Sequence, residues 1–463
     1  MREFRNKFIG DKAFYKMVMS IAVPIMLQNG ITNFVSLLDN IMVGRLGTEQ
    51  LSGTSIVNQL AFIYFLCIFG AVSGAGIFTA QFYGKGDNEG IRNTFRYKLW
   101  LCTIISILTI ILFSLAKTPL INAYLKSETN VENAALTLEY GRQYLMIIIF
   151  SLPAFAISQT YASTLRECGQ TFFPMISAAI SVFVNLILNY LLIYGKLGLP
   201  AMGVKGAALA TVISRYVELL SIILFTHCNR KSNHFSVGLY RTLRVPAALT
   251  GNILKKGTPL LINETLWATG MALLSQCYAT RGINVIAGQN IATTINNIFN
   301  IVFVAMGDCI AIVVGQALGA QDMKRARDTD NKLIAFSLAL SSTIALIMFF
   351  LAPLFPQMFN TNQQSRELAR QFIMCNAIFM PQACFLHVSY FTLRSGGKTI
   401  VTFLFDSVFI LCVSFPVALI LSRLTGLSAI TLFVIVNLCD LIKSIVGFVL
   451  VKKGVWIQNI VNI

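Results

Sequence analysis

Six of the 19 acidic residues lie inside long apolar runs, where a charged side chain costs about 2.5–3.5 kcal/mol to insert into a bilayer. They are Asp39, Glu218, Glu264, Asp308, Asp406 and Asp440. Acids at such positions predict sites that bind ions or substrates. Glu218 lies three residues after Arg215, and Asp440 lies three residues before Lys443, so each pair shares a helix face and can neutralise itself. For these two pairs we favour a structural role over a role in gating.

Asp39 and Glu264 have no cation within four residues. Each lies in an apolar run that also contains a proline, Pro24 or Pro259, and a proline inside a helix removes a backbone hydrogen bond and permits bending. A carboxyl group on such a helix is suited to ion coupling, because it can hold a proton or, with further oxygen ligands, Na⁺. For Asp39 the alternative is a position at the membrane interface, since Arg45 follows six residues later. We predict that both acids couple ions and that both prolines mark points of helix bending.

Two asparagines lie four residues apart in the sequence NLILNYLLIYGKLG (185–198), so Asn185 and Asn189 share one helical face. Amide oxygens beside a carboxylate can bind Na⁺, and amides can also hydrogen-bond a protonated acid. Taken alone, such a pair more often joins two membrane helices by hydrogen bonds.

Three further residues are candidates for a cavity that takes up a cationic substrate: Asp308, His387 and Asp406. Both acids could equally lie near helix ends, and a histidine among aromatic residues is more often a packing residue. The sequence has no Walker A motif, no nucleophile elbow and no Cys/His metal-ligand spacing. We therefore expect neither an enzyme nor a bound cofactor, apart from the coupling ion.

The elements that must carry these residues are membrane-spanning helices. The 463-residue chain is 56% hydrophobic and 12% charged, with mean hydropathy +0.71, and this balance is typical of an all-α polytopic membrane protein. In a soluble chain the formal charge of +17 would suggest nucleic acid as a partner, but here the basic residues cluster between the apolar runs. The breaks predict twelve spans at 16–41, 54–82, 96–116, 141–163, 172–194, 206–227, 257–280, 286–316, 333–352, 370–391, 399–421 and 428–450.

Both termini are predicted to be cytoplasmic, in a protein that crosses the cell membrane many times. With this orientation the cytoplasmic segments contain 24 of the 36 Lys and Arg residues, as the positive-inside rule requires. No cleavable signal is expected, because the first apolar run is too long for one.

The chain divides into two similar halves. Its longest connection, 228–256, is basic and predicts a cytoplasmic linker between an N-lobe (1–227) and a C-lobe (257–463) of six helices each. At an offset of 235 residues six identities recur in one ungapped register: Pro24 and Pro259, Gly47 and Gly282, Gly53 and Gly288, Gln81 and Gln316, Gly84 and Gly319, and Asp87 and Asp322. Further along, at an offset of 228, LRECGQT (165–171) meets LRSGGKT (393–399). Six spans in each half make the repeat parallel, as in transporters that rock two bundles around a central site.

Several stretches together resemble the multidrug and toxic compound extrusion (MATE) family, over essentially the whole chain. They are DNIMVGRLGTEQLSG (39–53), GAGIFTAQFYGKGD (74–87), LRECGQTFFPM (165–175), NLILNYLLIYGKLGLPAMGVKGAALAT (185–211) and VGQALGAQDMKRA (314–326). The resemblance implies two six-helix lobes around a central cleft, and secondary antiport of organic, often cationic, compounds against H⁺ or Na⁺.

The resemblance also implies site residues. Asp39 matches the first-helix acid of the family, and Asn185 and Asn189 match the polar pair that accompanies it, so these three residues form a candidate H⁺ or Na⁺ site. Glu264 matches the seventh-helix acid of NorM-like members. Asn189 stands where the DinF-like branch usually has Asp, so the chain leans toward the NorM-like branch. Residues 371–390 depart from that branch, because they contain no carboxylate, and the N-lobe cluster is therefore the better candidate for the coupling site.

The predicted function is an efflux antiporter whose partners are small organic, often cationic, compounds and the lipid bilayer. No nucleic acid and no obligate protein partner are expected. The alternative is a flippase for a lipid-linked precursor with a related two-lobe fold. A flippase would need a strongly cationic cleft for phosphate, whereas the unpaired intramembrane charges of this chain are mostly acidic. A channel or sensor has no need of the repeat, and an enzyme would lack catalytic residues.

Overall fold

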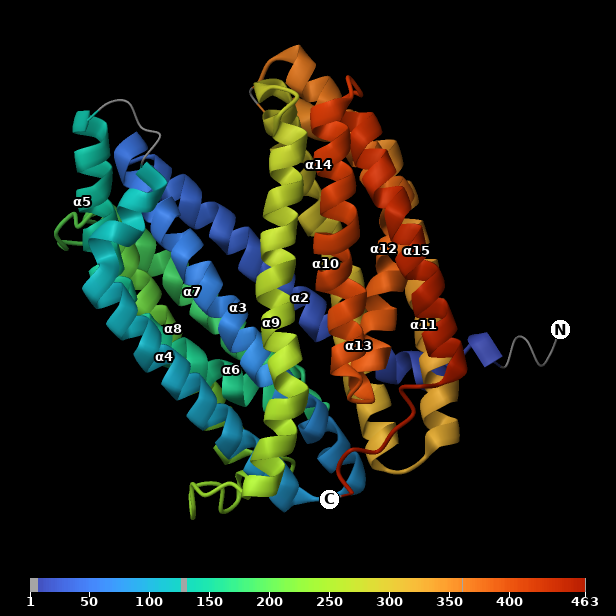
Figure 1. The fold of residues 1–463 in the computed structure, drawn as a ribbon. Helices are drawn as coiled ribbons and strands as arrows, with labels where there is room; N and C mark the ends of the chain where they lie inside the picture. The colour runs from blue at the N-terminus through green and yellow to red at the C-terminus, as the bar shows by residue number, and fades with distance from the viewer. Residues whose placement is uncertain (1–6, 126–130, 360, 463) are drawn as a thin grey trace. The chain divides into compact units, whose positions relative to one another are not determined.

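A computed structural model describes residues 7–125, 131–359 and 361–462, and within these ranges the regular elements are helices (Figure 1). The long helices are α2 (Lys12–Gly44), α3 (Thr48–Lys85), α4 (Asn88–Leu125), α5 (Val131–Ile148), α6 (Ser151–Glu167), α7 (Phe172–Tyr194), α8 (Val204–Cys228), α9 (Ala247–Ala279), α10 (Ile283–Gly319), α11 (Met323–Leu351), α12 (Gln363–Ser395) and α15 (Ala429–Lys453). Shorter elements are η1 (His234–Ser236), η2 (Phe355–Met358), α13 (Thr399–Phe403), η3 (Leu404–Val408), η4 (Ile410–Ser414) and α14 (Phe415–Leu424).

The helices correspond to the twelve predicted spans. Ten helical segments among the described residues are long and apolar enough to cross a membrane, with 399–424 counted as one, and the bent pair α5 and α6 makes eleven. The remaining helix, α9, has 33 residues and a length of about 50 Å, which exceeds the roughly 30 Å of a hydrocarbon core. Polar residues in its middle, Asn263 and Glu264 among them, lower its mean hydropathy. The prediction of an all-α polytopic fold is confirmed.

Local sequence explains where several helices begin and end. Asp322, Asn362 and Ser428 precede α11, α12 and α15, and each side chain accepts a hydrogen bond from the backbone N–H three residues later, at 2.9, 2.8 and 3.1 Å. Gly195 and Gly454 follow α7 and α15 in the left-handed conformation, with φ of 65° and 70°. The two glycines end α7 and α15 within three residues of the predicted ends at 194 and 450, whereas α11 and α12 begin ten and seven residues before their predicted spans, because their first turns are polar.

The fourth predicted span, 141–163, is wrong as a single helix. It is formed by α5 and α6, which meet at a bend of 49° around residues 149–150. Pro153 lies in the first turn of α6, where it has no N–H to donate and its ring would clash with the carbonyl four residues earlier. The proline therefore explains why a helix cannot run straight through this point.

The eleventh predicted span, 399–421, contains wide turns that the apolar pattern did not indicate. After α13 the chain forms two π-helical stretches, η3 and η4, before it continues as α14. A π-helical turn inserts an extra residue into the helix and is frequent at functional sites. Asp406 lies in η3.

By internal contacts the chain separates into two compact units. Unit 1 contains the residues up to Met26, 80–87 and those from Asn252 onward, and unit 2 contains 27–79 and 88–251. One division between the units, at 251–252, falls inside the predicted linker. The lobe boundaries at 1–227 and 257–463 stay a prediction.

The two units repeat one packing pattern. In unit 2, α6 packs against α4 and α8, and α7 packs against α8. In unit 1, α12 packs against α11 and α15, and α14 packs against α15. The repeat offsets relate α4 to α11, α6 to α12 and α8 to α15, so equivalent helices have equivalent neighbours.

Within unit 1 the end of α3 packs closely on the end of α10. A Cβ atom on Gly84 would collide with the carbonyl of Gln316, and one on Gly319 would collide with the carbonyl of Gln81. At an offset of 235 Gly84 matches Gly319 and Gln81 matches Gln316. Each half of the chain therefore contributes one glycine and one glutamine, at equivalent positions, to the contact. Only glycine permits two backbones to approach this closely.

Candidate functional site

The first candidate site joins Asp39 on α2 to the two asparagines on α7, all within unit 2. Asn189 Nδ2 donates to Asp39 Oδ1 at 2.6 Å and to Asn185 Oδ1 at 3.0 Å. Asn185 and Asn189 are 6% and 1% exposed, and Asp39 is half-buried. The structure thus brings together the three residues that the resemblance grouped.

The Asn185 amide can meet this carboxyl group in two orientations. Its outer amide atom lies 3.0 Å from Asp39 Oδ1 and 3.2 Å from Oδ2. If that atom is nitrogen, it donates to an ionised Asp39. If it is oxygen, it accepts from Asn189 and can also accept the proton of a neutral Asp39. One amide rotation therefore suits the site to either protonation state.

Further polar groups of unit 2 extend the cluster. Asn185 Nδ2, in its other orientation, donates to Thr211 Oγ1 on α8 at 3.4 Å. Arg215, one turn further along α8, is near enough for its charge to act on Asp39. The predicted Arg215–Glu218 ion pair is confirmed, with Nη1 and Oε2 2.8 Å apart. Sequence reasoning had no means of placing Arg215 near Asp39, because the two lie on helices far apart in the chain.

A second polar cluster lies in unit 1, around Asn263 on α9. Asn263 Nδ2 donates to Asp406 Oδ2 at 3.1 Å and to the Tyr390 hydroxyl at 3.4 Å. Ser407 Oγ lies 2.6 Å from Asn263 Oδ1 and 2.8 Å from its backbone oxygen. Asn263 is 2% exposed, so one buried amide ties α9 to the π-helical turn that carries Asp406. Nothing in the sequence around Asn263 indicates this role, apart from its position next to Glu264.

Lys443 does not make the ion pair that we predicted within α15. Its Nζ lies 3.4 Å from Asp406 Oδ1, and among the described residues its ion-pair partner is Asp406 rather than Asp440. The ammonium group also lies 5.8 and 5.7 Å from the ring centroids of Phe405 and Phe409. The cause of this correction is the wide turn at 404–408, which presents Asp406 and its aromatic neighbours to α15.

Glu264 belongs to the unit 1 cluster rather than to the Asp39 cluster. It follows Asn263 on α9 and is half-buried, and the charges of Arg394 and Asp406 act on it. Arg394 is 6% exposed, with its guanidinium 5.1 Å from the Phe391 ring. Glu264 thus has a cation near it that its own helix does not supply.

The remaining predicted residues all lie in unit 1. His387 on α12 packs with its ring 4.8 Å from Phe391 and 5.5 Å from Phe303, which suits the packing interpretation. Asp308 is half-buried on α10, directly after a glycine that contacts His387. Pro24 and Pro259 lie inside α2 and α9. Their role in bending, and the cavity role of Asp308, His387 and Asp406, stay predictions.

A buried ion pair in unit 2 was missed by sequence reasoning. Lys98 is 0% exposed, and its Nζ bonds with Glu167 and donates to Ser163 and Thr164 at 3.1 and 3.2 Å. Lys98 lies near the start of the predicted span 96–116, and Glu167 follows the end of the predicted span 141–163. The two residues lie 69 positions apart in the sequence, on different helices, so their ion pair leaves no local pattern that a single sequence could reveal.

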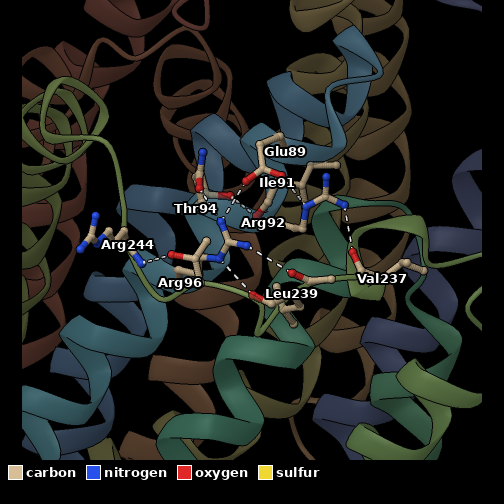
Figure 2. Close-up of polar contacts among 11 residues, drawn as sticks. Glu89, Ile91, Arg92, Thr94, Arg96, Val237, Leu239 and Arg244 are labelled. Atoms are coloured by element: carbon tan, nitrogen blue, oxygen red, sulfur yellow. Dashed lines mark hydrogen bonds and ion pairs between the residues drawn. The ribbon is translucent and has the colours of Figure 1, made fainter.

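The linker is also held more firmly than its composition indicated. Arg92, Arg96 and Trp100 lie at four-residue steps on one face of α4, and their side chains donate to backbone carbonyls of the linker. Figure 2 shows the contacts of Arg92 and Arg96. The acceptors are Val237 at 3.1 Å, Leu239 at 3.0 Å and Leu243 at 3.0 Å. We call these three side chains the α4 clamp.

Tyr240 supports the α4 clamp from within the linker. Its hydroxyl bonds with that of Tyr161 on α6, and its ring lies edge-on to Phe95 on α4, 6.4 Å between centroids. Burial raises the pKa of the Tyr240 hydroxyl, which therefore stays protonated near neutral pH. The first part of the linker is thus an ordered part of unit 2.

A bundle of long apolar helices in two repeated halves, with carboxylates and amides buried between the helices, defines a polytopic membrane transporter. The chain belongs to the MatE family, whose model matches residues 24–191 and 259–422. The two matches begin at the two prolines that the repeat pairs. The family is one of transporters rather than enzymes, and the predicted resemblance is confirmed.

Curated relatives match almost the whole chain. A Thermotoga maritima protein named probable multidrug resistance protein NorM is 24% identical over 416 residues, covering 88% of this chain and 86% of its own. A protein of the same name from Mannheimia succiniciproducens is 25% identical, covering 97% and 90%. Probable multidrug resistance protein YoeA of Bacillus subtilis is 23% identical, covering 89% and 88%. The NorM names agree with the predicted lean toward the NorM-like branch.

Solved structures have the same fold. A crystal structure described as MATE in the bent conformation has a TM-score of 0.84 at 19% identity, covering 95% of each chain. An outward-facing multidrug resistance MATE family transporter has a TM-score of 0.82 at 19% identity, covering 96% of each chain. The similarity shows that the chain has the twelve-helix, two-lobe layout of MATE transporters.

Proposed function

We propose that the protein is a secondary antiporter that exports small organic, often cationic, compounds in exchange for H⁺ or Na⁺ by alternating access of its two lobes. The observation that carries the proposal is the Asp39 cluster, a carboxyl group held by two buried amides inside a fold shared with multidrug transporters. The names of the relatives support the substrate class. The buried acids agree better with this function than with a lipid-linked precursor flippase.

The geometry of the Asp39 cluster favours H⁺ over Na⁺ as the coupling ion. Asn189 directs an N–H, rather than an oxygen, at Oδ1 of Asp39. In this orientation the Asn189 amide offers no oxygen ligand to an Na⁺ ion beside Oδ1 of Asp39. A proton needs only the rotation of the Asn185 amide. Proton binding at Asp39 thereby changes which groups the two asparagines can bond, and such a change can be coupled to helix movement.

We place the protein in the cell membrane with both termini in the cytoplasm, on the distribution of Lys and Arg. In this orientation the linker is cytoplasmic. Because the α4 clamp holds the linker on unit 2 as far as Leu243 and α9 begins at Ala247, the part of the linker between them is only residues 244–246. This tether is much shorter than the predicted linker.

The test is ethidium transport in energised everted vesicles that contain Asp39→Asn. If Asp39 carries the coupling charge, the variant loses gradient-driven accumulation, because one charge moved across 100 mV is worth about 2.3 kcal/mol, or about fifty-fold in concentration. Glu139→Gln is the matched control, since Glu139 is an exposed acid of the same unit. Full gradient-driven transport by an Asp39→Asn variant would contradict the assignment. Loss of transport in both variants would indicate a general effect of removing an acid.

The coupling ion is tested separately. Transport is measured with a pH gradient alone and then with an Na⁺ gradient alone. We expect the pH gradient to suffice. Transport driven only by the Na⁺ gradient would contradict H⁺ coupling without contradicting antiport.

A further inference from the structure

Unit 1 has an open apolar groove between α9 and α13, two elements that Figure 1 draws side by side. The groove has a volume of about 490 Å³. Its lining consists of Leu254, Lys255, Thr258, Pro259, Ile262, Ile400 and Phe403. Apart from Lys255 and Thr258 these are apolar residues, and Leu254, Ile262 and Ile400 are 46%, 44% and 56% exposed. In a membrane such a surface is covered by a hydrocarbon chain.

Three lysines lie at one end of this groove. Lys255 lines it, and the charges of Lys255 and Lys398 act on Lys256. The Lys256 side chain reaches Gly397, one residue before Lys398, because a Cβ atom on that glycine would lie 3.7 Å from Lys256 Cε. No ion pair joins any of the three lysines to an acid among the described residues. The groove end thus concentrates positive charge that the protein leaves uncompensated.

We propose that this groove binds an anionic phospholipid of the cytoplasmic leaflet, with an acyl chain along α9 and α13 and the phosphate at Lys255, Lys256 and Lys398. An apolar groove capped by unpaired cations complements both parts of such a lipid, whereas a zwitterionic lipid offsets its phosphate with a cation of its own and brings no net negative charge to the lysines. A free phosphate ion would not use the apolar lining. The proposal takes from the proposed function only the cytoplasmic placement of the linker end.

The experiment is native mass spectrometry of the full chain in detergent, titrated with phosphatidylglycerol and, separately, with phosphatidylcholine. We expect phosphatidylglycerol to bind at least tenfold more tightly. Since each lysine near an anionic headgroup strengthens binding about fivefold, Lys255→Gln with Lys256→Gln should weaken phosphatidylglycerol binding about 25-fold. Binding is read without any transport, so its failure and failure of the proposed antiport are distinguishable.

Two variants separate this site from general attraction to positive charge. Lys452→Gln with Lys453→Gln removes two exposed lysines from the end of α15, and it should leave binding unchanged. Thr258→Trp keeps all the charges but fills the groove, and it should weaken binding as much as the loss of the two lysines. Equal weakening by the α15 variant would overturn the proposal. Unchanged binding by the double Lys255 and Lys256 variant, or by Thr258→Trp, would overturn it too.

Discussion

Replacing Arg96 by glutamine should release the linker from α4. Arg96 is 2% exposed, and its guanidinium donates to the carbonyls of Leu239 at 3.0 Å and Gly238 at 3.4 Å (Figure 2). It also bonds with Glu89 at 2.9 Å. That contact lies within α4, and the Glu89 side chain is 55% exposed, so it adds little to holding the linker.

The magnitude follows from the two carbonyl contacts. A hydrogen bond from a charged donor contributes about 1.5–3 kcal/mol, and the contact at 3.4 Å is close to the limit of a bond. We therefore expect Arg96→Gln to lower the free energy that holds the linker on α4 by about 2 kcal/mol. Because about 1.36 kcal/mol corresponds to a factor of ten, the population of the detached linker should rise about thirty-fold. Arg92 and Trp100 remain in place, so the linker should open locally rather than unfold with unit 2.

The assay is hydrogen exchange by mass spectrometry on a peptide covering 234–243. Its backbone amides at Ser236, Val237 and Arg241 bond within the linker at 2.9, 3.2 and 3.2 Å, so their exchange reports linker opening. We expect exchange about thirty-fold faster in Arg96→Gln, by the population estimate from the lost bonds. Arg244→Gln, which removes an exposed arginine of the same segment, should exchange as the wild type does. Exchange within about threefold of the wild type in Arg96→Gln would refute the argument that the α4 clamp holds the linker.

Three other substitutions test other contacts. Gln81→Leu removes two side-chain bonds to the segment 456–462, one to the carbonyl of Gln458 and one from the Ile460 amide. Exchange in this segment should therefore rise about thirty-fold, at about 1 kcal/mol per bond, and unchanged exchange would show that the segment is held elsewhere. Lys443→Met should lower the thermal midpoint by leaving Asp406 without its cation, and adding Asp406→Asn should recover part of the loss; equal midpoints for the single and double variants would indicate no pairing. Glu264→Gln should change the ion dependence of drug efflux, and transport at the wild-type rate with unchanged ion dependence would remove Glu264 from the mechanism.

The helices and the repeat could be predicted from the sequence because both are recorded locally. An apolar run of spanning length has no other stable conformation in a bilayer than a helix, so eleven of the twelve predicted spans correspond to continuous helical segments. The break between α5 and α6 follows from Pro153, a signal that is present in the sequence inside the predicted span 141–163. The π-helical turns before α14 have a comparable signal in Pro416, which has no N–H to donate to the preceding turn, although a proline does not specify which kind of turn forms.

The contacts of the candidate sites were less predictable than the residues. Asp39, Asn185 and Asn189 could be grouped because the resemblance to a family supplied a contact between distant helices. No such help existed for Lys443, whose nearest acid in the sequence is Asp440, but whose ion-pair partner is Asp406, 37 residues away. Sequence spacing favours the pair within one helix, whereas packing decides which acid the ammonium group reaches.

Equivalent positions of the two halves keep the same close backbone contacts and the same hydroxyl groups, but they do not keep the same charged partners. Thr164 and Thr392 are equivalent at an offset of 228. In unit 2 Thr164 accepts a hydrogen bond from Lys98 at 3.2 Å, whereas in unit 1 Thr392 donates one to Asp330 at 2.6 Å. A hydroxyl group can do either, so the same residue serves a cation in one half and an acid in the other. Oδ2 of Asp330 has no hydrogen-bond partner among the described residues, although the carboxyl group is buried.

The two halves also differ in charge at the position of Asp39. Its equivalent at an offset of 235 is Leu274, which is 7% exposed on α9 and can hold no ion. The acids of unit 1, Glu264 and Asp406, lie at other positions and have Arg394 or Lys443 near them. If Asp39 alone carries the coupling charge, Asp39→Asn should abolish gradient-driven transport rather than halve it. A variant that keeps half of the wild-type accumulation would instead show that the second half of the chain couples an ion by different residues.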